Sequence, residues 1–180
     1  MGRTYVALLR GINVGGRRKL PMADLRALLE ALGHEDVTTY VQSGNAVFRS
    51  GGGSATSVAA AIEWRIESEL GLDVAVMLRT AAQLRAVLDG DPFPKAERKQ
   101  VHVVFLEEKP SATAAKRLDP DRSPGDEASL RGRELYLRLG NGAGRTKLTL
   151  DWIEKQLGVR GTGRNWNTVT KLAELAGERS

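Results

Sequence analysis

A basic, glycine-rich segment near the start of the chain has the composition of a loop that holds an anion. Within residues 10–19 the sequence places four cations, three glycines and an asparagine: Arg10, Arg17, Arg18, Lys19, Gly11, Gly15, Gly16 and Asn13. Glycine leaves backbone N–H groups accessible and the cations supply charge, which is how glycine-rich loops hold phosphates. The segment lacks the lysine and hydroxyl residue of a Walker A loop, and it does not match G-x-G-x-x-G. We therefore expect an anion-binding loop of no standard class, and the alternative is a structural turn with solvated cations.

The second polar segment, Tyr40–Asn45, lies between two expected strands. Ser43 and Asn45 can orient a ligand there, although such residues between strands commonly bond the local backbone. Ser43 does not stand in a G-x-S-x-G motif, and neither histidine of the chain has a motif spacing to it. We therefore do not expect a serine hydrolase.

The third polar segment precedes the last expected helix. Thr162 or Asn165 can cap that helix, and Arg164 lies at its N-terminal end, which favours negative charge. Asn167 and Lys171 are four residues apart and share one face of the helix. The alternative is a purely structural cap beside a tryptophan of the core.

These three segments share small or amide-bearing residues next to cations. If the two halves of the chain pack side by side, the segments converge on a cleft between the subdomains. We therefore expect a binding protein for a phosphate-bearing ligand, which is a nucleotide, phosphate or a nucleic-acid backbone. Two alternatives stay open: an enzyme of unknown class that uses the same cleft, and a structural or interaction module in which Trp64 is the contact residue.

The composition excludes several other classes of protein. The 180 residues include no cysteine and two histidines, so we expect no disulfide framework, no cysteine nucleophile, no metal site and no cofactor. The net charge of +5 comes from 27 Lys+Arg against 22 Asp+Glu and is spread along the chain, so by itself it does not identify a nucleic-acid binder. Without a leader or an apolar run of membrane-spanning length, we expect a cytoplasmic protein with no membrane partner.

The apolar pattern predicts an α+β fold with two similar ferredoxin-like subdomains packed together. Residues 1–79 are expected to form βαββαβ, with strands at 4–9, 37–41, 45–48 and 74–78 and helices at 21–32 and 58–70. Residues 80–100 are expected to form a connecting helix and a proline-containing linker. Residues 101–180 are expected to form a βαββαα variant, with strands at 101–106, 129–131 and 134–139 and helices at 112–118, 148–157 and 166–176.

Three stretches resemble the signature blocks of one bacterial family, domain of unknown function 1697. They are Ala7–Gly16, Thr39–Phe48 and Gly163–Leu172, so the resemblance extends from one end of the chain to the other. It implies a compact α+β protein with two similar subdomains, and it implies no established activity, substrate or cofactor. Family members tend to have Lys or Asn after the double glycine, where this chain has Arg17 and Arg18.

Overall fold

The computed structural model describes residues 2–179, and the chain divides into two compact units. Unit 1 contains Met1–Ala86 together with Lys171–Ser180, and unit 2 contains Val87–Thr170. The sequence places residues 171–180 in the second half, whereas the structure groups them with unit 1.

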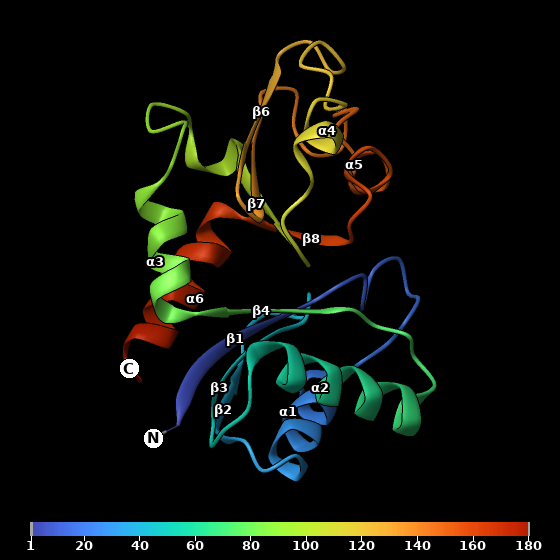
Figure 1. Ribbon diagram of the computed structural model, residues 1–180, viewed down its shortest axis with the longest axis vertical. Coiled ribbons are helices and arrows are strands. Elements are labelled where there is room, and N and C mark those ends of the chain that lie inside the picture. The colour runs from blue at the N-terminus through green and yellow to red at the C-terminus, as the bar shows by residue number, and fades with distance from the viewer. Residues whose placement is uncertain (1, 180) are drawn as a thin grey trace. The chain divides into compact units, whose positions relative to one another are not determined.

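Unit 1 is built on a four-stranded antiparallel sheet with the order β2-β3-β1-β4. Its elements run β1 (Arg3–Leu9), α1 (Met22–Ala31), β2 (Glu35–Thr39), β3 (Asn45–Ser50), α2 (Ala55–Leu70) and β4 (Val76–Thr80), and α3 (Ala81–Asp89) follows. The helices α1 and α2 lie on the same face of this sheet (Figure 1). The expected order βαββαβ is therefore present in unit 1.

Local sequence explains why α2 begins and ends where it does. The Ser54 hydroxyl accepts a hydrogen bond from the Ser57 N–H at 3.1 Å, which satisfies a free donor of the first turn. The helix ends at Gly71, which has a φ of 65° and adopts the left-handed conformation. Between these ends, Val58, Ile62 and Ile66 form the buried stripe of the helix and pack in one core with residues of β1, β3 and α1.

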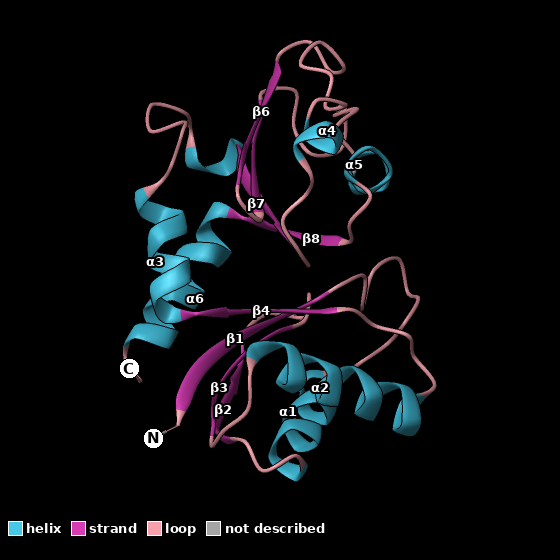
Figure 2. Ribbon diagram, viewed as in Figure 1, coloured by secondary structure: helices cyan, strands magenta, loops and turns pink. Residues whose placement is uncertain are grey.

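Unit 2 repeats the plan of unit 1 (Figure 2). Its elements run β5 (Val101–Leu106), α4 (Ala112–Ala115), β6 (Asp126–Arg131), β7 (Glu134–Leu139), α5 (Leu150–Leu157) and β8 (Gly161–Asn165), with a 3-10 turn at Arg98–Gln100 before them. The last helix, α6 (Trp166–Gly177), begins in unit 2, and its residues from Lys171 on are grouped with unit 1. The sheet order is β6-β7-β5-β8, which matches the order in unit 1 strand for strand. The α+β class with two similar parts is confirmed.

The strand β8 was not expected, because the sequence pattern predicted βαββαα for the second half of the chain. Gly161–Asn165 contains two glycines and no apolar residue, so neither an apolar run nor a period of two marks it as a strand. It forms because it pairs with β5, where Thr162 lies opposite Phe105 and Arg164 lies opposite Val103. Both Thr162 and Arg164 are buried. The strand is therefore stabilised by pairing with a strand far away along the chain, which the local sequence does not indicate.

The duplicated plan places a buried arginine at the same position of each unit. Arg79 of β4 pairs with Val6 of β1, and Arg164 of β8 pairs with Val103 of β5. Arg79 is 1% exposed and Arg164 is 7% exposed. Burial lowers the pKa of Arg164 to about 10, so its guanidinium stays charged at neutral pH.

A buried carboxylate joins two loops of unit 2. Asp126 accepts hydrogen bonds from the Ser123 hydroxyl at 2.7 Å and from the Asn141 N–H at 3.0 Å. Ser123 in turn accepts from the Lys147 N–H at 3.0 Å, so the loops before β6 and after β7 are held together. Burial disfavours the charged carboxylate, but the hydrogen bonds from Asn141, Ser123 and Thr146 outweigh it and lower the pKa of Asp126.

This network predicts a loss of stability in acid. A carboxylate with a lowered pKa in the folded state stabilises the protein above its unfolded pKa, near 3.8, and this contribution disappears as the pH falls through the folded value. We expect the thermal midpoint of the wild type to fall more steeply below about pH 5 than that of Asp126→Asn, which has no carboxylate to protonate there. Circular dichroism melts from pH 7 to pH 3 measure this, and parallel curves for the two proteins would contradict it.

Candidate anion-binding site

Residues 10–19 form a loop with a tight turn at residues 14–17, and α1 begins only at Met22. The turn is closed by a hydrogen bond from the Arg17 N–H to the Val14 carbonyl at 3.1 Å. Its two central residues, Gly15 and Gly16, have φ values of 59° and 72°. Positive φ at both central positions is the signature of a type I′ turn, which glycine adopts at little steric cost. The double glycine is therefore required by the turn itself.

Asn13 holds this turn in place through its side chain. Its Nδ2 donates to the Leu20 carbonyl at 2.8 Å and to the Gln42 carbonyl at 2.6 Å, and its Oδ1 accepts from the Leu20 N–H at 2.8 Å. Asn13 also has a φ of 55°, a left-handed conformation that asparagine tolerates better than most residues. These contacts give Asn13 a positioning role, with its amide already engaged by the backbone.

Residues 40–45 comprise the second loop and the first residue of β3, and this segment packs directly against the first loop. A Cβ atom on Gly44 would lie 2.7 Å from Cδ1 of Ile12, so only glycine leaves room for the buried isoleucine. The Leu9 N–H donates to the Gly44 carbonyl at 2.9 Å, and Asn45 donates to the Tyr40 carbonyl at 2.9 Å. We call residues 10–19 and 40–45 together the loop pair.

Ser43 and Asn45, expected as ligand contacts, lie in this second segment. Asn45 is fully buried, and its Nδ2 donates to the Ser43 hydroxyl at 3.0 Å as well as to the Tyr40 carbonyl. Asn45 therefore holds the loop in shape through these buried hydrogen bonds, while Ser43 is exposed at the loop surface.

The loop pair concentrates unusual backbone conformations. Among the described residues other than glycine, four have positive φ, and three of them lie here: Asn13, Arg18 and Val41. Val41 is the least expected, because a β-branched residue strongly disfavours its φ of 51°, and its side chain is 48% exposed. Strain of this kind persists only where the surrounding contacts impose it, and it is common at binding sites.

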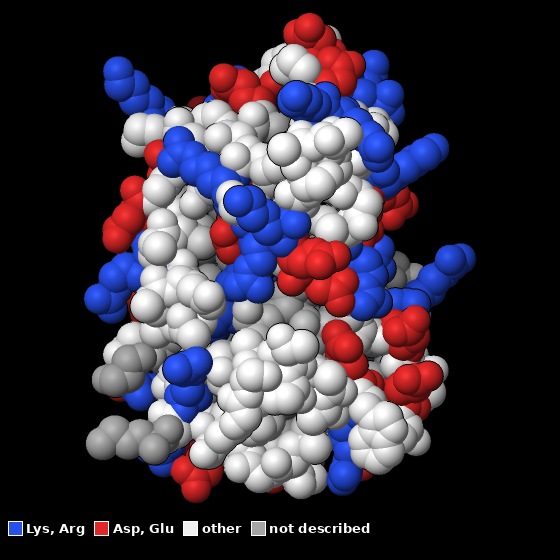
Figure 3. Space-filling view, viewed as in Figure 1, with Lys and Arg blue, Asp and Glu red and all other residues white. Residues whose placement is uncertain are grey.

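The cations that follow the double glycine have no acidic partners among the described residues. Arg17, Arg18 and Lys19 are all exposed, and none lies within ion-pair distance of a carboxylate among residues 2–179. Elsewhere, in contrast, Arg49 pairs with Glu35 at 2.7 Å and Arg160 pairs with Glu107 at 2.8 Å. Positive and negative side chains are also intermixed on the face shown in Figure 3. The run that follows the double glycine therefore carries positive charge that the described part of the chain does not neutralise.

Backbone donors lie beside these cations. The N–H groups of Gly11, Gly15 and Gly16 donate to no acceptor among the described residues, and all three glycines are exposed. Arg10 is half-buried at the start of the loop, and its N–H donates to the Ala75 carbonyl at 2.9 Å. Accessible N–H groups next to unpaired cations are the elements of a phosphate site.

The third polar segment lies mainly in unit 2, and its residues differ in exposure. Asn165 caps α6, as one of the two expected caps, by accepting a hydrogen bond from the Thr168 N–H at 2.9 Å. Arg164 is buried, and its Nη1 donates to the Thr162 hydroxyl at 2.6 Å and to the Gly163 carbonyl at 2.8 Å. The side chains of Asn167 and Lys171 are both exposed on α6, as their spacing predicts, and Lys171 belongs to unit 1.

Two features were missed in the sequence. Arg79 had no motif, and its burial follows only from the position of β4 in the sheet. The segment 90–95 was expected to be a linker, and its Pro-Phe-Pro sequence could have indicated an aromatic residue held by restricted backbone; Phe93 is half-buried. Within residues 2–179 no group of three or more His, Asp or Glu side chains could hold a metal, and no helix is both long and apolar enough to cross a membrane.

A solved structure, described as that of conserved bacterial protein SP0830 from Streptococcus pneumoniae, is similar to this chain along nearly its whole length. The two are 22% identical, with a TM-score of 0.78, and the match covers 98% of this chain and 99% of that one. At this level of identity the likeness shows the fold alone. No curated protein matches the chain.

A family profile described as protein of unknown function, DUF1697, matches residues 2–136. The matched range contains both halves of the loop pair. It ends before the third polar segment. Because the match spans more than half of the chain, the protein belongs to the DUF1697 family of proteins of unknown function.

Proposed function

We propose that the protein binds a phosphate-bearing ligand, a nucleotide or a nucleic-acid backbone, at the loop pair of unit 1. The observation that carries this proposal is the exposed run Arg17–Lys19, unpaired among the described residues, beside glycine N–H groups without an acceptor. Arginine binds phosphate oxygens through two parallel N–H groups, and backbone N–H groups add geometry. The hydrogen bonds of the Asn13 side chain with Leu20 and Gln42, which we call the clasp, keep these donors in one arrangement before the ligand arrives, which lowers the entropic cost of binding.

The proposal also covers the fold type of each unit and the cell compartment in which the protein acts. The order βαββαβ in both units supports a ferredoxin-like description of each. The lack of cysteine is consistent with the cytoplasm as the place where the protein acts.

A thermal-shift titration with pyrophosphate, ATP and a short single-stranded RNA tests the proposed site. A ligand that binds only the folded protein stabilises it by about 2.7 kcal/mol at a hundred times its Kd. We expect pyrophosphate, which carries no base, to raise the thermal midpoint of the wild type, and Arg17→Ala/Arg18→Ala to abolish that rise. The three ligands separate a compact phosphate, a nucleotide and a nucleic-acid backbone.

The matched control is Lys116→Ala/Arg117→Ala. It also removes two positive charges, but from exposed residues of unit 2, and should leave the ligand-induced rise in thermal midpoint unchanged. Equal losses in the two double variants would mean that the ligand responds to net charge and not to the loop pair. No rise with any of the three ligands would refute the proposal.

A further inference from the structure

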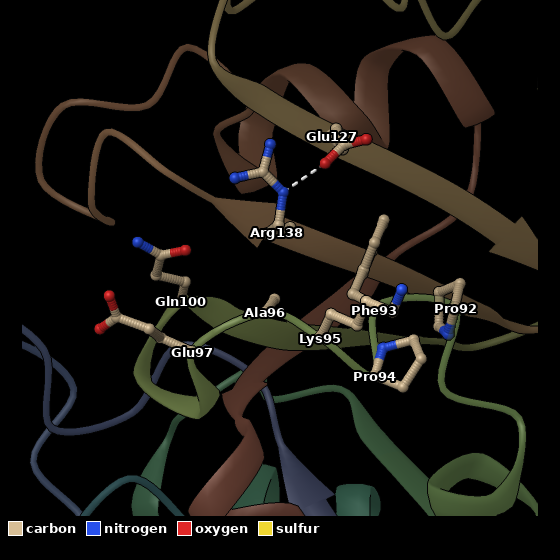
Figure 4. Close-up of a pocket in the computed structure, with 9 residues that line it drawn as sticks. All are labelled: Pro92, Phe93, Pro94, Lys95, Ala96, Glu97, Gln100, Glu127 and Arg138. Atoms are coloured by element: carbon tan, nitrogen blue, oxygen red, sulfur yellow. Dashed lines mark hydrogen bonds and ion pairs between the residues drawn. The ribbon is translucent and has the colours of Figure 1, made fainter.

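Unit 2 contains an open pocket of about 510 Å³, far along the chain from the loop pair. One wall is the segment 92–97 with Gln100, and the other comes from Glu127 of β6 and Arg138 of β7. Figure 4 shows the Phe93 side chain pointing from the segment toward the strands that carry this charged pair. The volume falls in the range of pockets that hold small ligands.

The segment that forms the first wall is fixed by a single arginine. Arg98 Nη1 donates to Asp91 Oδ2 at 2.6 Å, Nη2 donates to the Phe93 carbonyl, and Nη2 also reaches the Ala96 carbonyl at 3.0 Å. Its guanidinium carbon lies 5.2 Å from the ring centroid of Trp166, a cation–π contact. The segment therefore wraps around Arg98, which holds the backbone at Phe93 in place before any ligand binds.

The charges around the pocket are largely paired, which identifies the groups left to bind a ligand. Glu127 pairs with Arg138, and Glu97 pairs with Lys99 at 3.0 Å. The ammonium of Lys95 and the side-chain amide of Gln100 have no partner among the described residues. The pocket thus offers an aromatic ring, an amide that both donates and accepts, and one cation.

We propose that this pocket binds a nucleobase that carries a phosphate. The base stacks on Phe93, the Gln100 amide bonds the edge of the base, and Lys95 binds the phosphate. A base has an aromatic face and an edge with both donors and acceptors, so it uses all three groups, whereas phosphate alone uses only Lys95. This site involves none of the residues of the loop pair and does not depend on the function proposed there.

Titration of the full-length protein with AMP, followed by the amide signals of Ala96 and Gln100 in NMR spectra, tests the site. We expect saturable shifts of these signals with AMP and UMP, and weaker ones with adenosine. Phe93→Ala should weaken AMP binding about fivefold to a hundredfold, which is the effect of removing one stacking ring. Phe93→Trp should retain binding, which distinguishes stacking from a general disturbance of the fold.

Further variants assign the phosphate contact and separate the two proposed sites. Lys95→Ala should weaken AMP but not adenosine, and Lys109→Ala, an exposed lysine outside the pocket, should change neither. AMP binding should also persist in Arg17→Ala/Arg18→Ala, since those residues belong to the other unit. A short oligonucleotide that shifts the same signals at lower concentration than AMP would identify a nucleic-acid chain as the source of the base. Binding of AMP that is unchanged in Phe93→Ala, or lost in Arg17→Ala/Arg18→Ala, would overturn the pocket as a nucleotide site.

Discussion

Gly44→Ala will lower the stability of the protein by about 3 kcal/mol, which corresponds to a fall in thermal midpoint of about 10 °C for a chain of this length. Two causes add. The φ of 88° at this position is unfavourable for any residue with a Cβ atom. The new Cβ would also lie 2.7 Å from Cδ1 of Ile12 and 3.0 Å from Cβ of Leu9, and both of these residues are buried in the core.

Gly142→Ala is the matched control for Gly44→Ala. Gly142 has a φ of 83°, but a Cβ atom there would meet no heavy atom within 4 Å. Its substitution therefore costs the backbone term alone, about 1 kcal/mol. Thermal melts of both variants should show a clearly larger loss for Gly44→Ala. Equal losses would mean that the close contact between the two loops does not constrain the protein.

Asn13→Ala will destabilise the protein by about 2 kcal/mol and will remove the anion affinity of the loop pair. The substitution breaks three hydrogen bonds, each with a net value of about 1 kcal/mol, partly offset because one of them is exposed to water. It also places alanine at a φ of 55°. Without the clasp to Leu20 and Gln42, the cations that follow the double glycine lose their fixed arrangement, so binding weakens although no charge is removed.

Asn167→Ala provides the comparison for this variant. Asn167 is an exposed asparagine whose side chain bonds to no other described residue, so its loss should change stability by less than about 0.5 kcal/mol. Chemical denaturation gives the two stabilities, and a pyrophosphate titration gives the two affinities. Wild-type pyrophosphate affinity in Asn13→Ala would show that the clasp has no part in binding.

Much of the fold follows from local sequence, because strong patterns mark most elements. The stripe Val58, Ile62 and Ile66 with Gly71 predicts α2, and the apolar run Val101–Leu106 predicts β5 with its observed bounds. The strand β8 could not be predicted, since Gly161–Asn165 has no apolar residue and depends on pairing with β5. The family resemblance seen in the sequence is confirmed by the match over residues 2–136.

The residue types of the candidate site could be predicted from the sequence. Which of these residues hold the loop in place and which are exposed could not. Glycines and cations in residues 10–19 predict an anion loop, and anion binding there stays a prediction. The sequence does not show that the side chain of Asn13 is held by backbone groups, whereas that of Arg17, four residues later, is exposed. Such a distinction depends on the second loop, about thirty residues away along the chain, whose contact with the first is a tertiary property.

The measurement that most directly tests the central claim is a pyrophosphate titration monitored by the backbone amide signals of Gly11, Gly15 and Gly16 in NMR spectra. Binding at the loop pair predicts saturable shifts that are largest at these three amides, because their N–H groups are the donors free to meet the anion. The shifts should vanish in Arg17→Ala/Arg18→Ala and persist in Lys116→Ala/Arg117→Ala. Absent shifts, or shifts that are largest outside residues 10–19 and 40–45, would contradict a phosphate site in the loop pair.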